Sequence, residues 1–170
     1  MKPSRAASAH TGKATTVVSA KEGAAQFVAR PPRLVVVDAS FVLRYVLHTQ
    51  SARPHPRGLQ MLDECELLVP TLWHAEVANA LVQAERRGAA TAERVGQALA
   101  AILALEPEVD VQPVDVSLNL ELARAHGLSA YDSLYLELAH RRRAALATYD
   151  TEMAAAAQRA GIRLYPTFQV

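Results

Sequence analysis

The stretch Leu34-Val-Val-Val-Asp-Ala-Ser40 decides the fold. Its first four residues form a short, continuous apolar run rich in β-branched side chains, which is typical of a strand buried on both faces. Apolar residues at helical spacing follow from Phe41 to Leu47. An acidic residue, Asp38, therefore stands where a buried strand is expected to give way to a helix.

The alternation of short apolar runs and amphipathic stretches continues along the chain. Further strands are predicted at residues 66–69, 109–114, 145–149 and 162–165, and further helices at 59–65, 71–87, 91–105, 116–126, 129–143 and 151–160. Residues 51–57, with Pro54 and Pro56, are expected to form a loop. This order predicts an α/β fold with a central parallel sheet of about five strands, covered by helices on both faces.

Composition and charge divide the chain into two parts. Residues 1–30 carry a net charge of +4 and are rich in Ala, Ser and Thr, so we expect a disordered basic leader. A basic arm that touches nucleic acid, or a start codon assigned too far upstream, would also explain this segment. Residues 31–170 carry −3 and are expected to form one domain. No apolar run approaches the ~20 residues that span a bilayer, so no membrane association is expected.

The lack of lysine and of a second cysteine in the domain excludes some classes of site. All three lysines lie in the leader, so the domain has no G-x-x-x-x-G-K phosphate-binding loop and no mechanism that needs a positioned lysine. Cys65 is the one cysteine, which excludes an intrachain disulfide and fits a cytoplasmic protein.

Four acidic residues occupy positions where they can meet. Asp38 and Asp150 directly follow predicted strands, and in a parallel sheet ligands bind beyond the carboxyl ends of the strands. Glu76 and Asp132 lie early in predicted helices. Each acid also has a local explanation: Asp38 and Asp150 suit helix N-caps, Glu76 suits a solvated helix border, and Ser129 with Asp132 resembles a capping box.

If the four carboxylates converge, their mutual repulsion raises their pKa values unless a cation neutralises them. Oxygen ligands without a Cys/His cluster favour Mg²⁺ or Mn²⁺ over zinc. Such an ion supports phosphodiester cleavage. For Asp132, a water-mediated role fits the sequence as well as direct ligation.

Four motifs, taken in order and spacing, resemble a known family. They are Val37-Asp-Ala-Ser40, Glu76-Val-Ala-Asn-Ala-Leu81, Leu128-Ser-Ala-Tyr-Asp-Ser-Leu-Tyr-Leu136 and Leu146-Ala-Thr-Tyr-Asp150. Together they resemble a PIN domain, and more narrowly the VapC-type toxins of bacterial toxin–antitoxin pairs, over about residues 33–166.

The resemblance implies a three-layer α/β/α fold and an Mg²⁺- or Mn²⁺-dependent endoribonuclease that hydrolyses RNA phosphodiester bonds. It implies a catalytic and metal-binding site made of Asp38, Glu76, Asp132 and Asp150, supported by the polar residues Ser40, Asn79 and Thr148. It also implies a homodimer and a cognate antitoxin that blocks the cleft.

The arginines give a less definite prediction for RNA binding. Arg44, one turn before His48 in the segment after the first strand, is the best single candidate for a substrate contact. The run Arg141-Arg-Arg143 is also available for phosphates, but cations at the end of a helix equally stabilise its dipole. The negative charge of the domain leaves a second hypothesis open, a catalytically inactive PIN-like module that binds proteins.

Overall fold

The structure is a computed structural model that describes residues 32–47 and 58–166. Its strands are β1 (Leu34–Val37), β2 (Glu66–Pro70), β3 (Glu108–Asp110) and β4 (Ala145–Ala147). Its helices are α1 (Ala39–Leu47), α2 (Trp73–Arg86), α3 (Ala92–Leu103), α4 (Val116–His126), α5 (Asp132–Arg141) and α6 (Thr151–Arg159), with a 3-10 turn at Gln60–Leu62. The predicted leader at 1–30 and the predicted loop at 51–57 lie outside the described residues.

The strands form one parallel sheet in the order β3-β2-β1-β4. All three pairings are parallel, with Val36 of β1 opposite Leu68 of β2 and Leu146 of β4. The predicted α/β fold with a central parallel sheet is therefore confirmed, and the four carboxyl ends lie along one edge.

The predicted number of about five strands is wrong for the described residues, which form a sheet of four. The segment expected as a fifth strand makes only an isolated bridge, between Leu146 and Leu164. Two backbone hydrogen bonds hold it there, from Leu146 N to Arg163 O and from Tyr165 N to Leu146 O, both 2.9 Å. The N–H groups that face β4 alternate along the segment, and the next one after Tyr165 would belong to residue 167, which lies outside the described residues.

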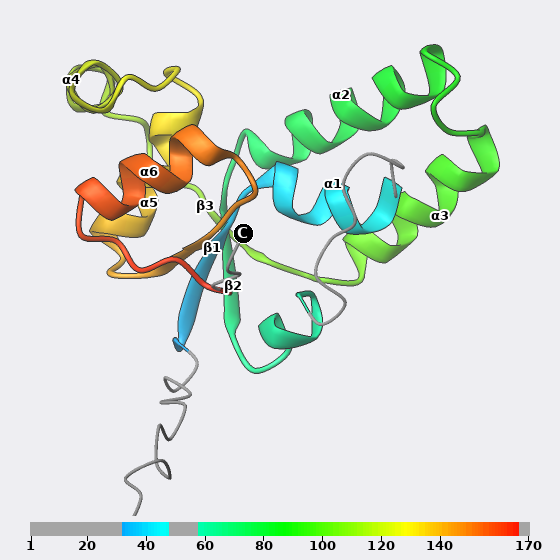
Figure 1. Ribbon diagram of the computed structural model, residues 1–170, viewed down its shortest axis with the longest axis horizontal. Helices are drawn as coiled ribbons and strands as arrows, with labels where there is room; N and C mark the ends of the chain where they lie inside the picture. The colour runs from blue at the N-terminus through cyan, green and yellow to red at the C-terminus, as the bar shows by residue number, and fades with distance from the viewer. Residues whose placement is uncertain (1–31, 48–57, 167–170) are drawn as a thin grey trace, which may run out of the picture.

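Helices cover both faces of the sheet, which gives the three layers (Figure 1). Helices α4, α5 and α6 lie on one side, where α5 packs against β1, β2 and β4. Helices α1, α2 and α3 pack on one another on the other side. None of the helices in the described ranges is long and apolar enough to cross a membrane.

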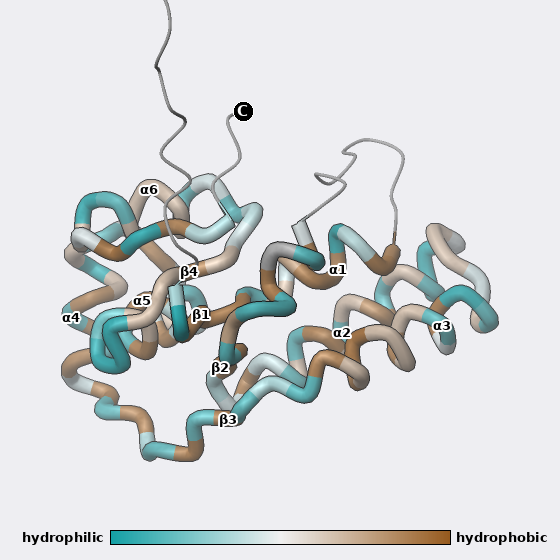
Figure 2. Tube along the Cα trace, turned by 90° about the horizontal axis from the view of Figure 1, so that it is seen from below, coloured by the Kyte–Doolittle hydropathy of each residue, from teal (hydrophilic) through white to brown (hydrophobic). Residues whose placement is uncertain are grey.

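The apolar runs of the sequence form the core. Val35, Val36, Leu68 and Leu146 are completely buried, and hydrophobic colour follows β1 and β2 through the middle of the molecule (Figure 2). Burying side chains of this size stabilises the fold by roughly 1.5–3 kcal/mol each. The sheet is thus a rigid support for whatever its carboxyl edge carries.

Several helices begin or end at a capping residue. Asp115 caps α4 by accepting a hydrogen bond from Leu118 N at 3.0 Å, and Thr91 caps α3 in the same way from Arg94 N. Gly127 ends α4 in the left-handed conformation, with φ 70°. These caps are local interactions, so they determine where α3 and α4 begin and where α4 ends.

Candidate functional site

The four predicted acids all lie at the carboxyl edge of the sheet. Asp38 follows β1 and Asp150 follows β4, and these two strands are neighbours. Glu76 is in the first turn of α2, which follows β2, and Asp132 is the first residue of α5. The junctions after β1, β2 and β4 therefore each present one of the four acids, and α5 adds the fourth.

Asp38 is the most buried of the four, with 5% of its surface exposed. Its carboxylate accepts hydrogen bonds from the hydroxyls of Ser40 and Thr148, the latter at 2.8 Å, and from the backbone N–H of Ser40. Burial raises the pKa of Asp38, these hydrogen bonds oppose that rise, and the negative charge of Asp150 adds to it. The backbone bond is the predicted N-cap, so capping and site positions coincide.

Thr148 links the first acid to the fourth. Its hydroxyl donates to Asp38 and accepts from the backbone N–H of Asp150 at 2.9 Å. Asp150 itself caps α6 by accepting from Met153 N at 2.7 Å through Oδ1. Oδ1 of Asp150 thus caps the helix, whereas among the described residues Oδ2 accepts no hydrogen bond from a helix amide.

Glu76 is half-buried and receives the hydroxyl of Tyr135 as a hydrogen-bond donor. Burial raises the pKa of Glu76, the bond from Tyr135 opposes this, and the charges of Asp38 and Asp132 add to the rise. Glu76 is therefore close enough to both aspartates to feel their charge.

Asp132 is held by Ser129. Its backbone N–H donates to the Ser129 hydroxyl at 3.1 Å, and that hydroxyl donates to Oδ2 of Asp132 at 2.6 Å. The Ser129 side chain therefore both fixes the start of α5 and orients the carboxylate.

The acids interact in a row, Asp150 with Asp38, Asp38 with Glu76, and Glu76 with Asp132. Within residues 32–47 and 58–166, none of the four makes an ion pair with Lys, Arg or His. Neighbouring carboxylates that lack a cation, one of them nearly fully buried, make a strongly unfavourable arrangement unless a cation is bound.

A hard divalent cation fits this chemistry. The side chains offer carboxylate and hydroxyl oxygens, which Mg²⁺ and Mn²⁺ prefer. The described parts of the chain contain no group of three or more Asp, Glu, His or Cys side chains arranged to bind a metal ion. Mg²⁺ does not require one, because it usually keeps several waters and binds through one or two carboxylates.

The three predicted supporting residues have different surroundings. Ser40 and Thr148 both donate to Asp38. Asn79 lies exposed on α2, and in the described structure no hydrogen bond joins it to the acids. The guanidinium of Arg44, predicted to contact substrate, lies over the ring of Tyr149 at 4.3 Å, next to Asp150.

Tyr135 was not predicted from the sequence. Its side chain is fully buried, and its hydroxyl accepts the backbone N–H of Ala39 while it donates to Glu76. Burial and the Glu76 bond raise the pKa of Tyr135 well above its usual range, so the hydroxyl stays protonated. It joins α5 to the start of α1 and to α2. The sequence did contain a hint of this role, because Tyr135 lies one turn beyond Asp132 on an apolar helix face. A buried tyrosine hydroxyl usually has a hydrogen-bond partner.

A family model described as "PIN domain" matches residues 35–159, which include all four acids. The chain belongs to the PIN domain family. The predicted resemblance is thereby confirmed at the level of the family.

Solved structures resemble this PIN domain at low sequence identity. The crystal structure of PAE2754 from Pyrobaculum aerophilum is 23% identical over 72% of this chain and 83% of that chain, with a TM-score of 0.51. The crystal structure of FitAcB from Neisseria gonorrhoeae is 17% identical over 77% and 96% of the two chains, with a TM-score of 0.49. A comparison with curated proteins gave no match. The first likeness supports the fold.

Proposed function

We propose that this PIN domain is an endoribonuclease that depends on Mg²⁺ or Mn²⁺ and hydrolyses RNA phosphodiester bonds. The observation that carries the proposal is the row of four interacting carboxylates without a paired cation at the carboxyl edge of the sheet. Folded proteins leave buried acids in this state at functional sites, where the pKa is tuned for a task.

The residues of the site would have different roles. Asp38 and Asp150, the pair joined through Thr148, would hold the ion, with Glu76 and Asp132 completing the site directly or through water. A bound divalent ion activates water and stabilises the charge that develops on the phosphate. Ser40 and Thr148 orient the Asp38 carboxylate, and Tyr135 orients Glu76.

We further propose that the protein is the VapC-type toxin of a toxin–antitoxin pair. The order and spacing of the four motifs support this assignment, which brings with it a cognate antitoxin, a homodimer and action in the cytoplasm. The exposed apolar side chains Val111, Val116 and Leu120 around the start of α4 are available for a contact between proteins.

The test is cleavage of RNA and of DNA, side by side, by the purified full chain. With millimolar Mg²⁺ or Mn²⁺ we expect RNA to be cut to products with a 5′-phosphate and a 3′-hydroxyl, and EDTA to stop the reaction. Asp38→Asn should lose cleavage with an unchanged circular dichroism spectrum. Cleavage that persists in EDTA or in Asp38→Asn would refute the proposal, and cleavage of DNA alone would refute RNA as substrate.

One observation favours the second hypothesis, a catalytically inactive module that binds proteins. The described side chains do not form a ready-made group of three metal ligands. Such a module would cleave no RNA at any metal concentration and would not arrest growth when expressed without a partner, whereas the toxin should arrest growth through an intact Asp38.

A further inference from the structure

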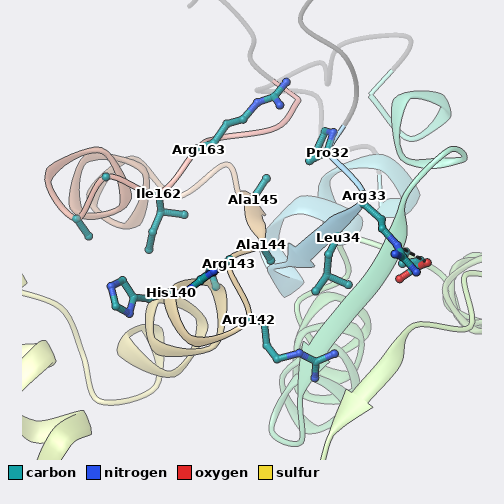
Figure 3. Close-up of a pocket in the computed structure, with 14 residues that line it drawn as sticks. Pro32, Arg33, Leu34, His140, Arg142, Arg143, Ala144, Ala145, Ile162 and Arg163 are labelled. Atoms are coloured by element: carbon teal, nitrogen blue, oxygen red, sulfur yellow. Dashed lines mark hydrogen bonds and ion pairs between the residues drawn. The ribbon is translucent and has the colours of Figure 1, made fainter.

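Positive charge gathers around a cavity at the opposite edge of the sheet. There β1 and β4 begin beside a hollow of about 960 Å³. Four arginines line it, together with His140 and a single carboxylate, Glu66; the arginines are Arg33, Arg142, Arg143 and Arg163. We call this cavity the basic hollow. Figure 3 shows Arg33 and Leu34 on one side of it, His140 and Ile162 on the other, and Arg143 between them.

The ion pairs of the basic hollow leave it with excess positive charge. Arg33 pairs with Glu66 at 3.1 Å, but both side chains are largely exposed, so the pair is weak. Arg142 pairs with Glu108 at 3.1 Å and with Asp110 at 3.5 Å. No ion pair of Arg143 is found among the described residues, and its side chain is exposed.

The backbone at Arg143 is unusual. It has φ 50°, in the left-handed region, just beyond the end of α5. Three other helices end with a glycine in this conformation, at φ 67° to 71°, namely Gly88, Gly127 and Gly161; after α3, Glu106 also adopts it. A glycine is the unstrained choice at such a position. An arginine there keeps a guanidinium at the rim in spite of the strain, which is the kind of outlier that points to function.

Stabilisation of helix ends explains only part of this charge. Helices α5 and α6 both end at the hollow, and their carbonyl ends favour cations. Arg33 precedes β1, however, and Arg163 lies four residues beyond the end of α6. The four arginines therefore line one cavity from three separate segments of the chain.

We propose that the basic hollow binds phosphate groups of an RNA strand. The inference rests on the proposed function and deepens it, because it locates the affinity for substrate. The acidic edge repels a phosphate backbone, and binding of nucleic acid draws most of its strength from arginine and lysine contacts to phosphates. Arginine also fits phosphate oxygens through two parallel hydrogen bonds. The hollow supplies this attraction away from the acids, so that holding the RNA and cutting it are separate tasks.

The experiment measures binding without cleavage. Fluorescence anisotropy of a labelled single-stranded RNA of about 20 nucleotides is followed with the full chain in EDTA, at several salt concentrations. The test variant is Arg143→Gly combined with Arg163→Gln. The glycine suits the left-handed backbone, so this variant removes charge without adding strain there. The control, Arg86→Gln with Arg124→Gln, removes two exposed arginines from α2 and α4.

We expect the test variant to raise the Kd about tenfold at 100 mM salt and to lower the slope of log Kd against log salt by about 1.4, as for two lost phosphate contacts. The control should stay within about twofold. An unchanged Kd in the test variant would overturn the proposal. So would displacement of RNA from the wild type by polyglutamate as readily as by unlabelled RNA, because the hollow would then take acidic protein segments.

Cleavage measured on the same proteins separates this inference from the proposed function. If both hold, the test variant shows a raised KM and an unchanged kcat. RNA binding that depends on Arg143 and Arg163, in a protein that cuts no RNA, would support the hollow and refute the nuclease. Cleavage with an unchanged KM in the test variant would support the nuclease and refute the hollow.

Discussion

Two groups of partly buried acids differ in how their charge is balanced. Beside β3, Asp110 and Glu137 are bound by Arg141 at 2.7 Å each, and Arg142 adds a contact to Asp110. At the carboxyl edge, Asp38 and Glu76 have hydroxyl donors but no cation in the described structure. Helix α5 takes part in both, since it carries Asp132 at its start and Glu137 near its end.

On the proposed function, this difference distinguishes acids with a structural role from acids of the active site. The hydrogen bonds to Glu137 and Asp110 raise the pKa of Arg141, which is the sign of mutual stabilisation. Burial and neighbouring carboxylates instead raise the pKa values of Asp38 and Glu76, which shows that their charged forms are disfavoured. The first group is balanced within the chain, and we propose that a bound cation balances the second.

A Glu→Gln substitution in each group tests this difference most strongly. Glu76→Gln should lower RNA cleavage by roughly two to three orders of magnitude, because it removes a charge from the reacting centre. Glu137→Gln should change cleavage by less than about twofold, since its partner is Arg141. Initial rates at saturating RNA measure both, and equal losses in the two variants would contradict the distinction.

Tyr135→Phe tests whether the buried hydroxyl orients Glu76. We expect kcat to fall about tenfold, with KM unchanged, because the carboxylate loses its donor but stays in place. The pH–rate profile should also shift to higher pH, since the bond from Tyr135 lowers the pKa of Glu76. A lower kcat with an unshifted profile would mean that Tyr135 acts only through packing.

Asp110→Asn tests the balanced group. Its loss leaves Arg141 and Arg142 with fewer acceptors, so the free energy of unfolding should fall by about 2 kcal/mol, as for a hydrogen bond to a charged group. Urea denaturation with unchanged m-value measures this, and Arg33→Gln, at the exposed pair with Glu66, serves as a control with an effect near zero. An unchanged free energy of unfolding in Asp110→Asn would show that its ion pairs with Arg141 and Arg142 do not stabilise the fold.

The smallest expected effect is the pH dependence of stability without metal. The folded pKa of Asp38 lies above its unfolded value near 3.8. The folded protein therefore holds the proton more tightly, and stability is lost as pH rises through the interval above that value. Asp38→Asn removes this loss, so its stability relative to wild type should be higher at pH 7 than at pH 4. A variant less stable at pH 7 than at pH 4, relative to wild type, would contradict the sign.

The position of the acids at the edge of the sheet could be predicted from the sequence because each follows a local rule. Asp38 and Asp150 come directly after apolar runs, and Ser129 with Asp132 forms a capping pattern. The interactions that depend on distant segments were not predictable. Thr148 approaches Asp38 only because β1 and β4 are neighbours, and Tyr135 reaches Glu76 from another helix.

Three further features needed the structure. The segment predicted as a fifth strand forms only one bridge, at Leu164, which the apolar pattern does not distinguish from a full strand. The run Arg141-Arg-Arg143 divides into residues with different partners, since Arg141 and Arg142 enter ion pairs and Arg143 lines the basic hollow. Periodicity places Asn79 and Glu76 on one border of α2, but only the fold shows that Asn79 is exposed.

The central claim is that the carboxyl edge of the sheet is a cation site, and calorimetric titration of Mn²⁺ into the RNA-free full chain tests it most directly. We predict saturable binding to the wild type and to Asp110→Asn, and no binding to Asp38→Asn at the same concentrations. Binding that is equal in the wild type and in Asp38→Asn, or that is absent from the wild type at millimolar Mn²⁺, would contradict it.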